Sequence, residues 1–387
     1  MGFQTDCTTT GEDREAYYGS VPPPIYESSL FTFPTFADFE AAFQSTDGRP
    51  VYTRGSNPTV RALEKKLALL ERGEDARVFA SGMAAIAAGV MSFAGSGDHV
   101  VAVRSIYNNA YRLLGNYLPR FGVETTFVDF TDLDAVERAI RPDTRLLYLE
   151  SPGNPGMHLV DLPATVDLAR RHNLPTMIDN SMATPYNQRP LDYGIDLVVH
   201  SATKYLAGHS DVVAGALIGT SDAVNRVAAN ELRDLGGIIG PFEAWLILRG
   251  IRTLGLRMKA HNDAGLRVAT WLAAHPRVLG VNYAGLRSHP QHDLAQRQMS
   301  GFSGLLSFVI DGGRDAATRL VDHLHLFGIA VSWGGFESLA LPMTPDPGAP
   351  PEMTTEVGLV PGLVRLSIGL EDVDDLLADL DQALARA

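Results

Sequence analysis

The chain has 387 residues, of which 45% are hydrophobic and 20% are charged. This composition is typical of globular proteins, and the length predicts two domains because it exceeds one core of ordinary size. The net charge is −13 and no run of basic residues occurs, which argues against nucleic acid or an anionic membrane surface as a partner.

Cysteine usage and hydrophobicity predict a soluble, cytoplasmic protein. Cys7 is the only cysteine, so no disulfide can form within the chain. Residues 1–14 are polar and acidic and lack the apolar segment of an export signal. No stretch approaches the ~20 apolar residues that a membrane span needs. We also expect no metal site.

Lysine is rare in this chain, and arginine supplies all the other basic residues. The lysines are Lys65, Lys66, Lys204 and Lys259. Chemistry that needs a primary amine therefore has few candidates. A helix is expected to begin after Asn57 as N-cap, with Pro58 at its first position. Lys65 and Lys66 fall opposite the leucines of this helix, where a lysine is normally solvated.

The hydrophobic pattern changes along the chain. Residues 1–50 show no sustained period and predict an extended arm with one short helix. From about residue 75 to 220, short apolar runs alternate with helical segments, which is typical of βαβ units and a mostly parallel sheet. The runs are 100–103, 146–149, 176–178 and 197–199.

The second half of the chain has a different pattern. A long helical region is expected over residues 241–272, followed by strands at 304–310 and 363–368 and a closing helix at 373–386. An α/β domain followed by a smaller α+β domain fits this order. The expected division is an arm over 1–55, an α/β domain over 56–245 and an α+β domain over 246–387.

Polar residues end two of the apolar runs, where open α/β sheets bind their ligands. Asp179 directly follows the third run, although a helix cap alone could explain it. Ser201, Thr203 and Lys204 follow the fourth run. A lysine amine at such a strand end can form an imine with an aldehyde cofactor, and the hydroxyls can bind the phosphate of that cofactor.

A third segment adds an anion site. Ser81, Gly82 and Met83 open an expected helix, whose free N–H groups and positive dipole end favour a phosphate, although an ordinary capped helix would look the same. Pyridoxal 5′-phosphate (PLP) chemistry needs this phosphate site, an imine-forming lysine, an aromatic face and an acid at the pyridine nitrogen. Asp179 and Lys204 stand in the right order, one βαβ step apart.

Two segments resemble the signature of the Cys/Met-metabolism PLP enzymes. They are DNSMATPY at 179–186 and SATKYLAGHSD at 201–211. This family includes cystathionine synthases and lyases, methionine γ-lyase and the O-acylhomoserine sulfhydrylases. The resemblance covers essentially the whole chain, including residues 52–59, 81–83, 150–155, 332–339 and 365–371. It implies fold type I of the PLP-dependent transferases, which is aspartate aminotransferase-like, and a homotetramer built as a dimer of catalytic dimers.

The resemblance also implies roles around the cofactor ring. Lys204 is similar to the Schiff-base lysine that later carries protons, and Asp179 is similar to the partner of the pyridinium nitrogen. Tyr107 resembles the tyrosine that stacks on the ring and serves in proton transfer. Asn154 would approach the ring's O3′ atom.

Phosphate and substrate ligands follow from the same resemblance. The implied phosphate ligands within the chain are Gly82, Met83, Ser201 and Thr203. Tyr52 and Arg54 resemble a pair that reaches the same phosphate from a neighbouring subunit. Arg365 would bind the α-carboxylate of an amino-acid substrate, with Ser332 beside it and Trp333 in the pocket.

Departures from the family pattern bear on the reaction type. Asn108 and Asn109 replace two glycines found in many members, and methionine γ-lyases typically carry a cysteine at the position of Asn109. Val331 and Trp333 flank Ser332 in a pattern similar to that of cystathionine β-lyases. The Tyr-x-Arg-x-x-Asn-Pro-Thr stretch at 52–59 is instead more similar to the γ-enzymes.

We expect a C–S lyase of cysteine and methionine metabolism that acts on cystathionine, or a related sulfur amino acid, by β-elimination. The alternative is γ-elimination or γ-replacement, as in cystathionine γ-lyase, cystathionine γ-synthase or an O-acylhomoserine sulfhydrylase. A third alternative, an inactive scaffold with the same fold, fits less well because every residue needed for PLP is present.

Overall fold

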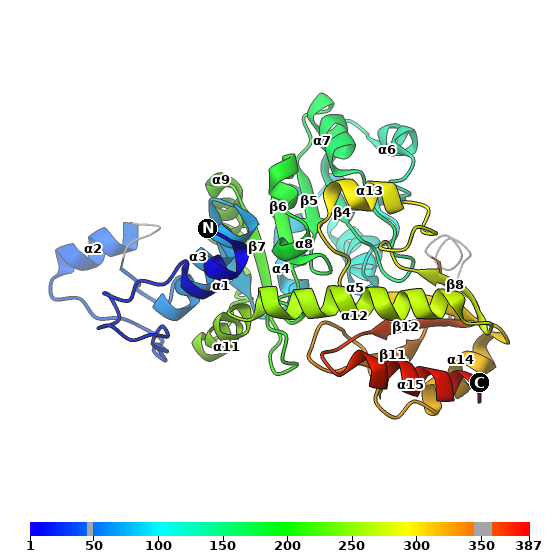
Figure 1. Ribbon diagram of the computed structural model, residues 1–387. Coiled ribbons are helices and arrows are strands. Elements are labelled where there is room, and N and C mark those ends of the chain that lie inside the picture. Colours follow the sequence, from blue (N-terminus) through cyan, green and yellow to red (C-terminus); the bar gives the residue numbers. More distant parts are fainter. Residues whose placement is uncertain (45–48, 344–357) are drawn as a thin grey trace.

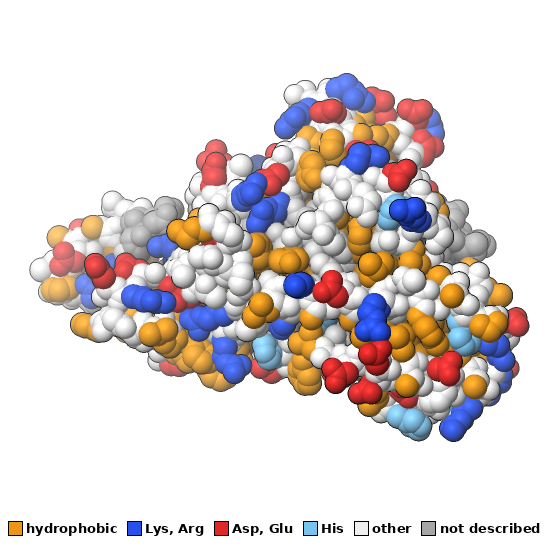
Figure 2. Space-filling model, viewed as in Figure 1, with side chains coloured by type: hydrophobic (Ala, Val, Ile, Leu, Met, Phe, Trp, Pro, Cys, Tyr) orange, Lys and Arg blue, Asp and Glu red, His pale blue; other side chains and the backbone are white. Residues whose placement is uncertain are grey.

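The computed structural model describes residues 1–44, 49–343 and 358–387. Figure 1 shows two sheets with helices packed around them, and at the left a part of the N-terminal arm, including residues 36–44, that lies away from both sheets. Figure 2 shows acidic and basic side chains mixed over one face, with hydrophobic side chains among them. In the described ranges no helix is both long and apolar enough to cross a membrane.

The larger sheet has seven strands in the order β1-β7-β6-β5-β4-β2-β3. Four of its six neighbouring pairs are parallel, and only the pairs that involve β7 are antiparallel. The predicted α/β fold with a mostly parallel sheet is confirmed. The strands are β1 (Asp75–Phe79), β2 (His99–Val103), β3 (Glu124–Val128), β4 (Thr144–Glu150), β5 (Thr176–Asp179), β6 (Leu197–His200) and β7 (Gly215–Gly219).

The central strands are apolar because helices cover both faces of this sheet. Every residue of β2, β5, β6 and β7 is buried. The helices of this part are α3 (Pro58–Glu71), α4 (Gly82–Phe93), α5 (Asn108–Arg112), α6 (Leu133–Ala139), α7 (Leu162–Arg171), α8 (Thr184–Asn187) and α9 (Ser221–Val227).

The smaller sheet has five strands in the order β10-β11-β12-β9-β8. They are β8 (Val278–Asn282), β9 (Leu305–Ile310), β10 (Gly328–Ile329), β11 (Leu339–Pro342) and β12 (Leu363–Ser367). The sequence predicted only β9 and β12, because the other three are short or lie at the exposed edge. The helical region after residue 240 is two helices, α11 (Pro241–Ile251) and α12 (Leu254–Ala274). The sheet packs with α12, α14 (Gly313–Asp322) and α15 (Val373–Leu384).

The arm contains two helices, α1 (Phe3–Thr9) and α2 (Phe36–Gln44), where one had been expected. Several of its apolar side chains are exposed, with Tyr18, Phe36 and Phe43 each more than two-thirds accessible. Phe33 packs on Phe39 of α2, whereas Phe36 and Phe43 of this helix stay exposed. Of the two arm helices, α1 is the one that packs closely on the body, against α3 and α12.

Helix α3 begins as predicted, with the Asn57 side chain accepting a hydrogen bond from the Thr59 N–H at 3.0 Å. Lys65 is exposed as expected, but the prediction for Lys66 is wrong because its side chain is fully buried. The segment after α1 covers this face of the helix. Gly11 has a φ of +78°, and a Cβ there would come within 2.9 Å of the Lys66 backbone nitrogen.

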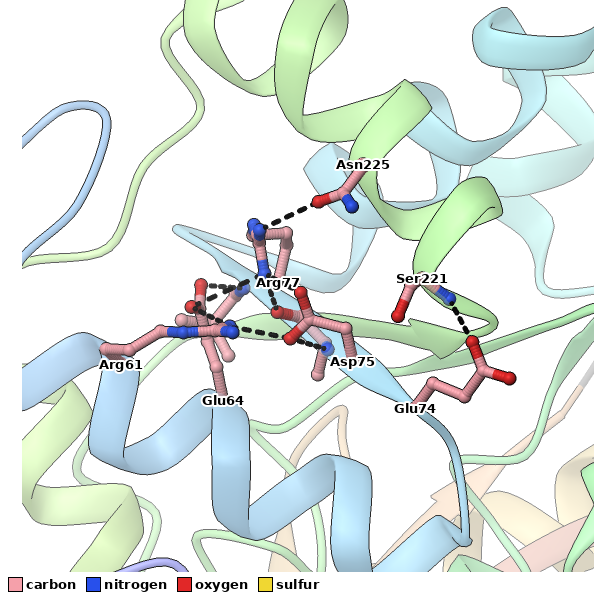
Figure 3. Close-up of polar contacts among 9 residues, drawn as sticks. Arg61, Glu64, Glu74, Asp75, Arg77, Ser221 and Asn225 are labelled. Atoms are coloured by element: carbon pink, nitrogen blue, oxygen red, sulfur yellow. Dashed lines mark hydrogen bonds and ion pairs between the residues drawn. The ribbon is translucent and has the colours of Figure 1, made fainter. Parts of the chain in front are cut away.

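A buried charge network ties α3 to the edge strand β1 (Figure 3). Asp75 accepts hydrogen bonds from Arg61 at 2.6 Å and from Arg77 at 2.7 Å, and Arg61 also pairs with Glu64 at 3.1 Å. Next to it, the Glu74 carboxylate accepts the backbone N–H of Ser221 at the start of α9, at 2.8 Å. This network fixes the sheet edge against which α4 packs.

Candidate active site

The carboxyl ends of three parallel strands carry the predicted acid and its neighbours. Glu150 ends β4, Asp179 ends β5 and His200 ends β6. Glu150 and Asp179 are Cα partners in the β4–β5 pairing, and Asp179 pairs with Val199 of β6. The strand-end position predicted for the site is therefore where the structure brings these groups together.

Asp179 is 8% exposed and its backbone neighbours hold it in place. Its Oδ1 atom accepts the Ser181 N–H at 2.9 Å, and the Ser181 hydroxyl accepts the Ser201 N–H at 2.6 Å. Burial raises the pKa of Asp179 above its ordinary value, opposed by the Ser181 hydrogen bonds and by the interactions with His200 and Lys204. An acid so placed can hold a proton on a partner nitrogen.

A buried polar network supports the loops behind Asp179. Glu71, at the end of α3, lies 2.5 Å from the His200 Nε2 atom and accepts a hydrogen bond from the Asn180 side chain at 2.9 Å. Asn180 in turn bonds with Gln188 in both directions at 3.0 Å. Glu71 and Gln188 thereby hold Asn180 and His200, the residues next to Asp179 and Ser201, in place.

Lys204 is the amine nearest to this acid. Its Nζ atom donates to the Ser332 hydroxyl at 2.5 Å and lies 5.3 Å from the centroid of the Trp333 ring. Burial, followed by the Arg365 charge, lowers the pKa of Lys204 to about 8, against an opposing contribution from Asp179. Lys204 forms no ion pair with any residue that the structure describes. A partly neutral, unpaired amine is a competent nucleophile and base.

The predicted substrate residues meet Lys204 from the smaller sheet. Arg365, on β12, is 8% exposed, and its guanidinium donates to the Ser332 carbonyl at 3.1 Å. Ser332 has a φ of +81°, a left-handed conformation that is unfavourable for a residue with a Cβ. Such backbone strain is commonly found at functional sites. Trp333 packs on Tyr205, with ring centroids 5.5 Å apart.

The residues predicted to bind the phosphate include those at the start of α4. Ser81 caps this helix by accepting the Ala84 N–H at 3.1 Å. A Cβ at Gly82 would come within 3.0 to 3.1 Å of three Ser201 atoms, so a side chain there would require Ser201 to shift. Gly82, Met83 and Ser201 thus share one cradle at a helix N-terminus. The Thr203 hydroxyl, in contrast, is engaged by the backbone of Ala214, at 2.9 Å from its N–H and 3.1 Å from its carbonyl.

Tyr107 and Asn154 stand beside the strand ends. The Tyr107 side chain is 47% exposed, and its hydroxyl accepts a hydrogen bond from the Asn109 amide at 2.8 Å. The Tyr107 N–H donates to the Glu150 carboxylate at 2.7 Å. The Oδ1 atom of Asn154 is buried and has no hydrogen-bond partner among the described residues. An unsatisfied buried oxygen is unfavourable unless a ligand pairs with it.

Within one chain, Tyr52 and Arg54 have no contact with the other predicted phosphate ligands among the described residues. Both are exposed, and the Arg54 guanidinium lies 5.7 Å from the Tyr52 ring. Arg54 donates to the Arg233 carbonyl at 2.5 Å. The pair faces outward from the base of the arm.

The sequence analysis did not predict the hydrogen bonds that Glu150, Ser181 and Asn109 make in the site. Glu150 could have been found, because it ends an apolar run in the same way as Asp179. The other two depend on side-chain geometry that no local pattern encodes.

The residues present fit PLP. They offer an amine with a lowered pKa, a buried acid at a strand end, an anion cradle and an unsatisfied amide oxygen. When bound here, PLP would be held by Lys204, with its phosphate at Gly82 and Ser201. It would supply an electron sink for carbanion chemistry.

Comparison with known proteins gives matches over nearly the whole chain. Residues 4–385 match the Cys/Met metabolism PLP-dependent enzymes. L-methionine gamma-lyase from Pseudomonas putida is 43% identical, with 99% of this chain and 97% of that protein covered. Cystathionine gamma-lyase from Bacillus subtilis is 42% identical (97% and 96% covered), and O-succinylhomoserine sulfhydrylase from Pseudomonas aeruginosa is 41% identical (99% and 95%). The crystal structure of metB from Corynebacterium glutamicum is 37% identical, with a TM-score of 0.91 and 100% and 98% of the chains covered.

Proposed function

The chain belongs to the Cys/Met metabolism PLP-dependent enzymes, and we propose that it cleaves the Cγ–S bond of a thioether amino acid by γ-elimination. Its cofactor is PLP, and it is a C–S lyase or trans-sulfuration enzyme of sulfur amino acids. In the proposed reaction, one thioether amino acid and one water give a thiol, α-ketobutyrate and ammonia.

The γ-chemistry replaces the β-elimination that the sequence favoured. The names of the similar proteins give γ-lyase and O-succinylhomoserine sulfhydrylase activities. The sequence argument for β-elimination also relied on Val331 next to Ser332, yet this side chain is 76% exposed. Trp333 does lie beside Lys204, but an indole at that place does not by itself select β-chemistry.

One observation carries the proposal: Ser332 holds both the Lys204 amine, through its hydroxyl, and the Arg365 guanidinium, through its carbonyl. A substrate carboxylate on Arg365 therefore sets its Cα and Cβ atoms near a single amine. γ-Elimination needs a proton removed from each of these carbons in turn. An amine that stays partly neutral can serve as the base in both steps.

The remaining side chains support these proton transfers. Lys204 would take the Cα proton, hand it on to the bound cofactor and so become neutral again, and would then take the Cβ proton. Asp179 would hold a proton on the ring nitrogen of bound PLP, which would supply the electron sink for the carbanion. The Tyr107 hydroxyl, held by Asn109, gives a proton to the departing sulfur.

We also propose that the site is completed by a neighbouring subunit. Tyr52 and Arg54 face outward at the base of the arm, residues 1–55, whose apolar side chains are exposed. On a second copy of the chain they would reach the cradle at Gly82. A homotetramer of two such dimers, with domains over 56–245 and 246–387, remains our expectation for the assembly.

A second candidate is γ-replacement on an O-acylhomoserine. The 41% identity to an O-succinylhomoserine sulfhydrylase favours it. The two reactions share proton removal at Cα and Cβ and differ in the leaving group and in whether a thiol adds back.

Product analysis with purified enzyme tests the proposal. Cystathionine, L-methionine and O-succinylhomoserine, the last with and without a thiol, would be compared by kcat/KM. We expect α-ketobutyrate from a thioether substrate. Pyruvate as the main product from cystathionine would restore β-elimination, and a new thioether formed only from O-succinylhomoserine would favour γ-replacement.

A further inference from the structure

Glu150 lies beside the acid of the site without a role in the reaction described above. It is the Cα partner of Asp179 in the parallel pairing of β4 and β5. Partner residues on parallel strands point their side chains to the same face of the sheet. The two carboxyl groups therefore face the site together.

The Glu150 carboxyl also joins the segments that carry two other candidate cofactor residues. Its Oε2 atom accepts the Tyr107 backbone N–H at 2.7 Å, and the carboxyl also receives a backbone hydrogen bond from Asn154. Tyr107 begins α5, whereas Asn154 lies in the loop after β4. One side chain thus connects the backbone of the stacking residue, the backbone of the O3′ neighbour and the acid's own strand.

The charges around the pair place its negative charge on Asp179. Desolvation and then the charge of Asp179 raise the pKa of Glu150 well above its ordinary value. Asp179 has Lys204, His200 and the Ser181 hydrogen bonds to favour its ionised form. Two adjacent buried carboxyls cannot both ionise easily, so burial and the neighbouring Asp179 favour the protonated form of Glu150, against the two backbone hydrogen bonds that it accepts.

We propose that Glu150 is a positioning residue for the cofactor ring. As a neutral hydrogen-bond acceptor it holds the backbones of Tyr107 and Asn154 at a fixed place relative to the strand end. Removal of its acceptor oxygens lets the stacking residue and the O3′ neighbour move independently of the acid. The inference rests on the cofactor roles proposed above, and is independent of the leaving group.

Two variants separate the acceptor from the charge. Glu150→Gln keeps an acceptor oxygen without any charge, and Glu150→Met keeps the length but removes both oxygens. The readouts are the Kd for PLP, the visible circular dichroism of bound PLP and the Tm of the cofactor-free protein. We expect Glu150→Gln to keep the Kd within about threefold and the dichroism unchanged. Glu150→Met removes the acceptor of both backbone hydrogen bonds and should weaken PLP binding at least about tenfold and reduce the dichroism.

A control lies at the opposite edge of the sheet, where β5 and β6 begin. The Asp196 carboxylate accepts the N–H and the hydroxyl of Thr176, both at 2.8 Å, and so also joins two segments through backbone and side chain. Asp196→Leu removes these two hydrogen bonds away from the site and should lower the Tm while leaving the dichroism of bound PLP unchanged. A role of Glu150 in stability alone would make the two variants alike in every readout.

Two results would overturn the inference. One is wild-type PLP affinity and dichroism in Glu150→Met; the other is equal damage in the Gln and Met variants, which would indicate a need for charge. If the Met variant does not fold, Glu150→Asp replaces it, because it withdraws the carboxyl by one methylene. Retained dichroism in Glu150→Asp would then refute the role, and reduced dichroism would support it.

These readouts need bound PLP and no turnover. A wild-type protein that binds PLP but gives no γ-elimination product would refute the proposed reaction and leave the test of Glu150 intact. Failure of the Glu150 variants to change the dichroism would leave the reaction proposal unaffected.

Discussion

Two of the four lysines are buried or nearly so, and they meet opposite surroundings. Lys66 is fully buried, with its amine 2.9 Å from the Glu12 carboxylate and 2.9 Å from the Cys7 carbonyl. Glu12 also binds Arg252 at 3.1 Å. Lys204 instead meets a hydroxyl and an indole, and has no carboxylate at ion-pair distance in the described chain.

The difference shows that the partner of a buried lysine, more than its burial, determines whether the lysine has a structural or a chemical role. Desolvation lowers the pKa of both amines, but at Lys66 the Glu12 carboxylate opposes it at contact distance. A paired cation is held in its charged form and serves as an anchor for the chain's first residues. An amine without such a partner is available for covalent and proton-transfer chemistry.

The largest expected effect comes from removing the unpaired amine. Lys204→Ala should lower kcat by at least ~10³-fold, because both the covalent attachment of PLP and the base are lost. Lys65→Ala, an exposed lysine beside Lys66, is the control and should keep wild-type kcat. Borohydride reduction followed by peptide mapping should find PLP on Lys204. PLP on Lys66 would contradict the conclusion that the paired lysine is structural and the unpaired one reactive.

Removing the paired amine should affect stability and leave the chemistry intact. Lys66→Ala leaves Glu12 buried beside Arg252 with one partner fewer, and should lower the free energy of unfolding by about 3 to 5 kcal/mol in urea titrations. Combining Lys66→Met with Glu12→Gln removes both charges and should restore part of this loss. Wild-type stability of Lys66→Ala would show that the pair is not an anchor.

The pH dependence of cofactor uptake sharpens the contrast. With a pKa of about 8 against an ordinary 10.5, Lys204 loses its proton in the folded protein before it does in the unfolded chain. This group therefore makes the cofactor-free protein more stable as pH rises from about 8 to 10.5, and below that window its buried charge is unfavourable.

Only the neutral amine attacks an aldehyde, so the rate of PLP uptake should rise about tenfold per pH unit below 8 and level off above it. The visible absorbance of bound PLP in a stopped-flow mixing experiment follows this rate. Arg365→Gln removes a charge that lowers the pKa of Lys204, and should shift the curve to higher pH. A rate that still rises steeply above pH 9 in the wild type would contradict the lowered pKa.

The smallest expected effect tests whether a second chain completes the Lys204 region. Arg54→Ala and Lys204→Ala subunits should each be inactive, whereas equal mixtures should recover about a quarter of wild-type activity. Random pairing makes half of the dimers mixed, and each mixed dimer has one intact site of two. No recovery despite demonstrated subunit exchange would place Arg54 outside a shared site.

Much of the fold and the site followed from local pattern. The alternation of apolar runs and helices predicted the parallel sheet, and the residues that end those runs predicted Asp179 and Lys204 at its edge. Chain order suffices here, because parallel strands bring their carboxyl ends to one side wherever the helices lie. The Asn57–Pro58 start of α3 likewise depends on capping chemistry within a few residues.

Only the tertiary structure decided the surroundings of those groups. Helical periodicity placed Lys66 on a solvated face, since it cannot register that a distant segment with Glu12 covers that face. The link from Glu150 to Tyr107 depends on strand register and on a loop 43 positions away. The short strands β8, β10 and β11 form only because neighbours supply their hydrogen bonds. Local residues determine which groups reach the sheet edge, whereas long-range packing determines which charges face one another there.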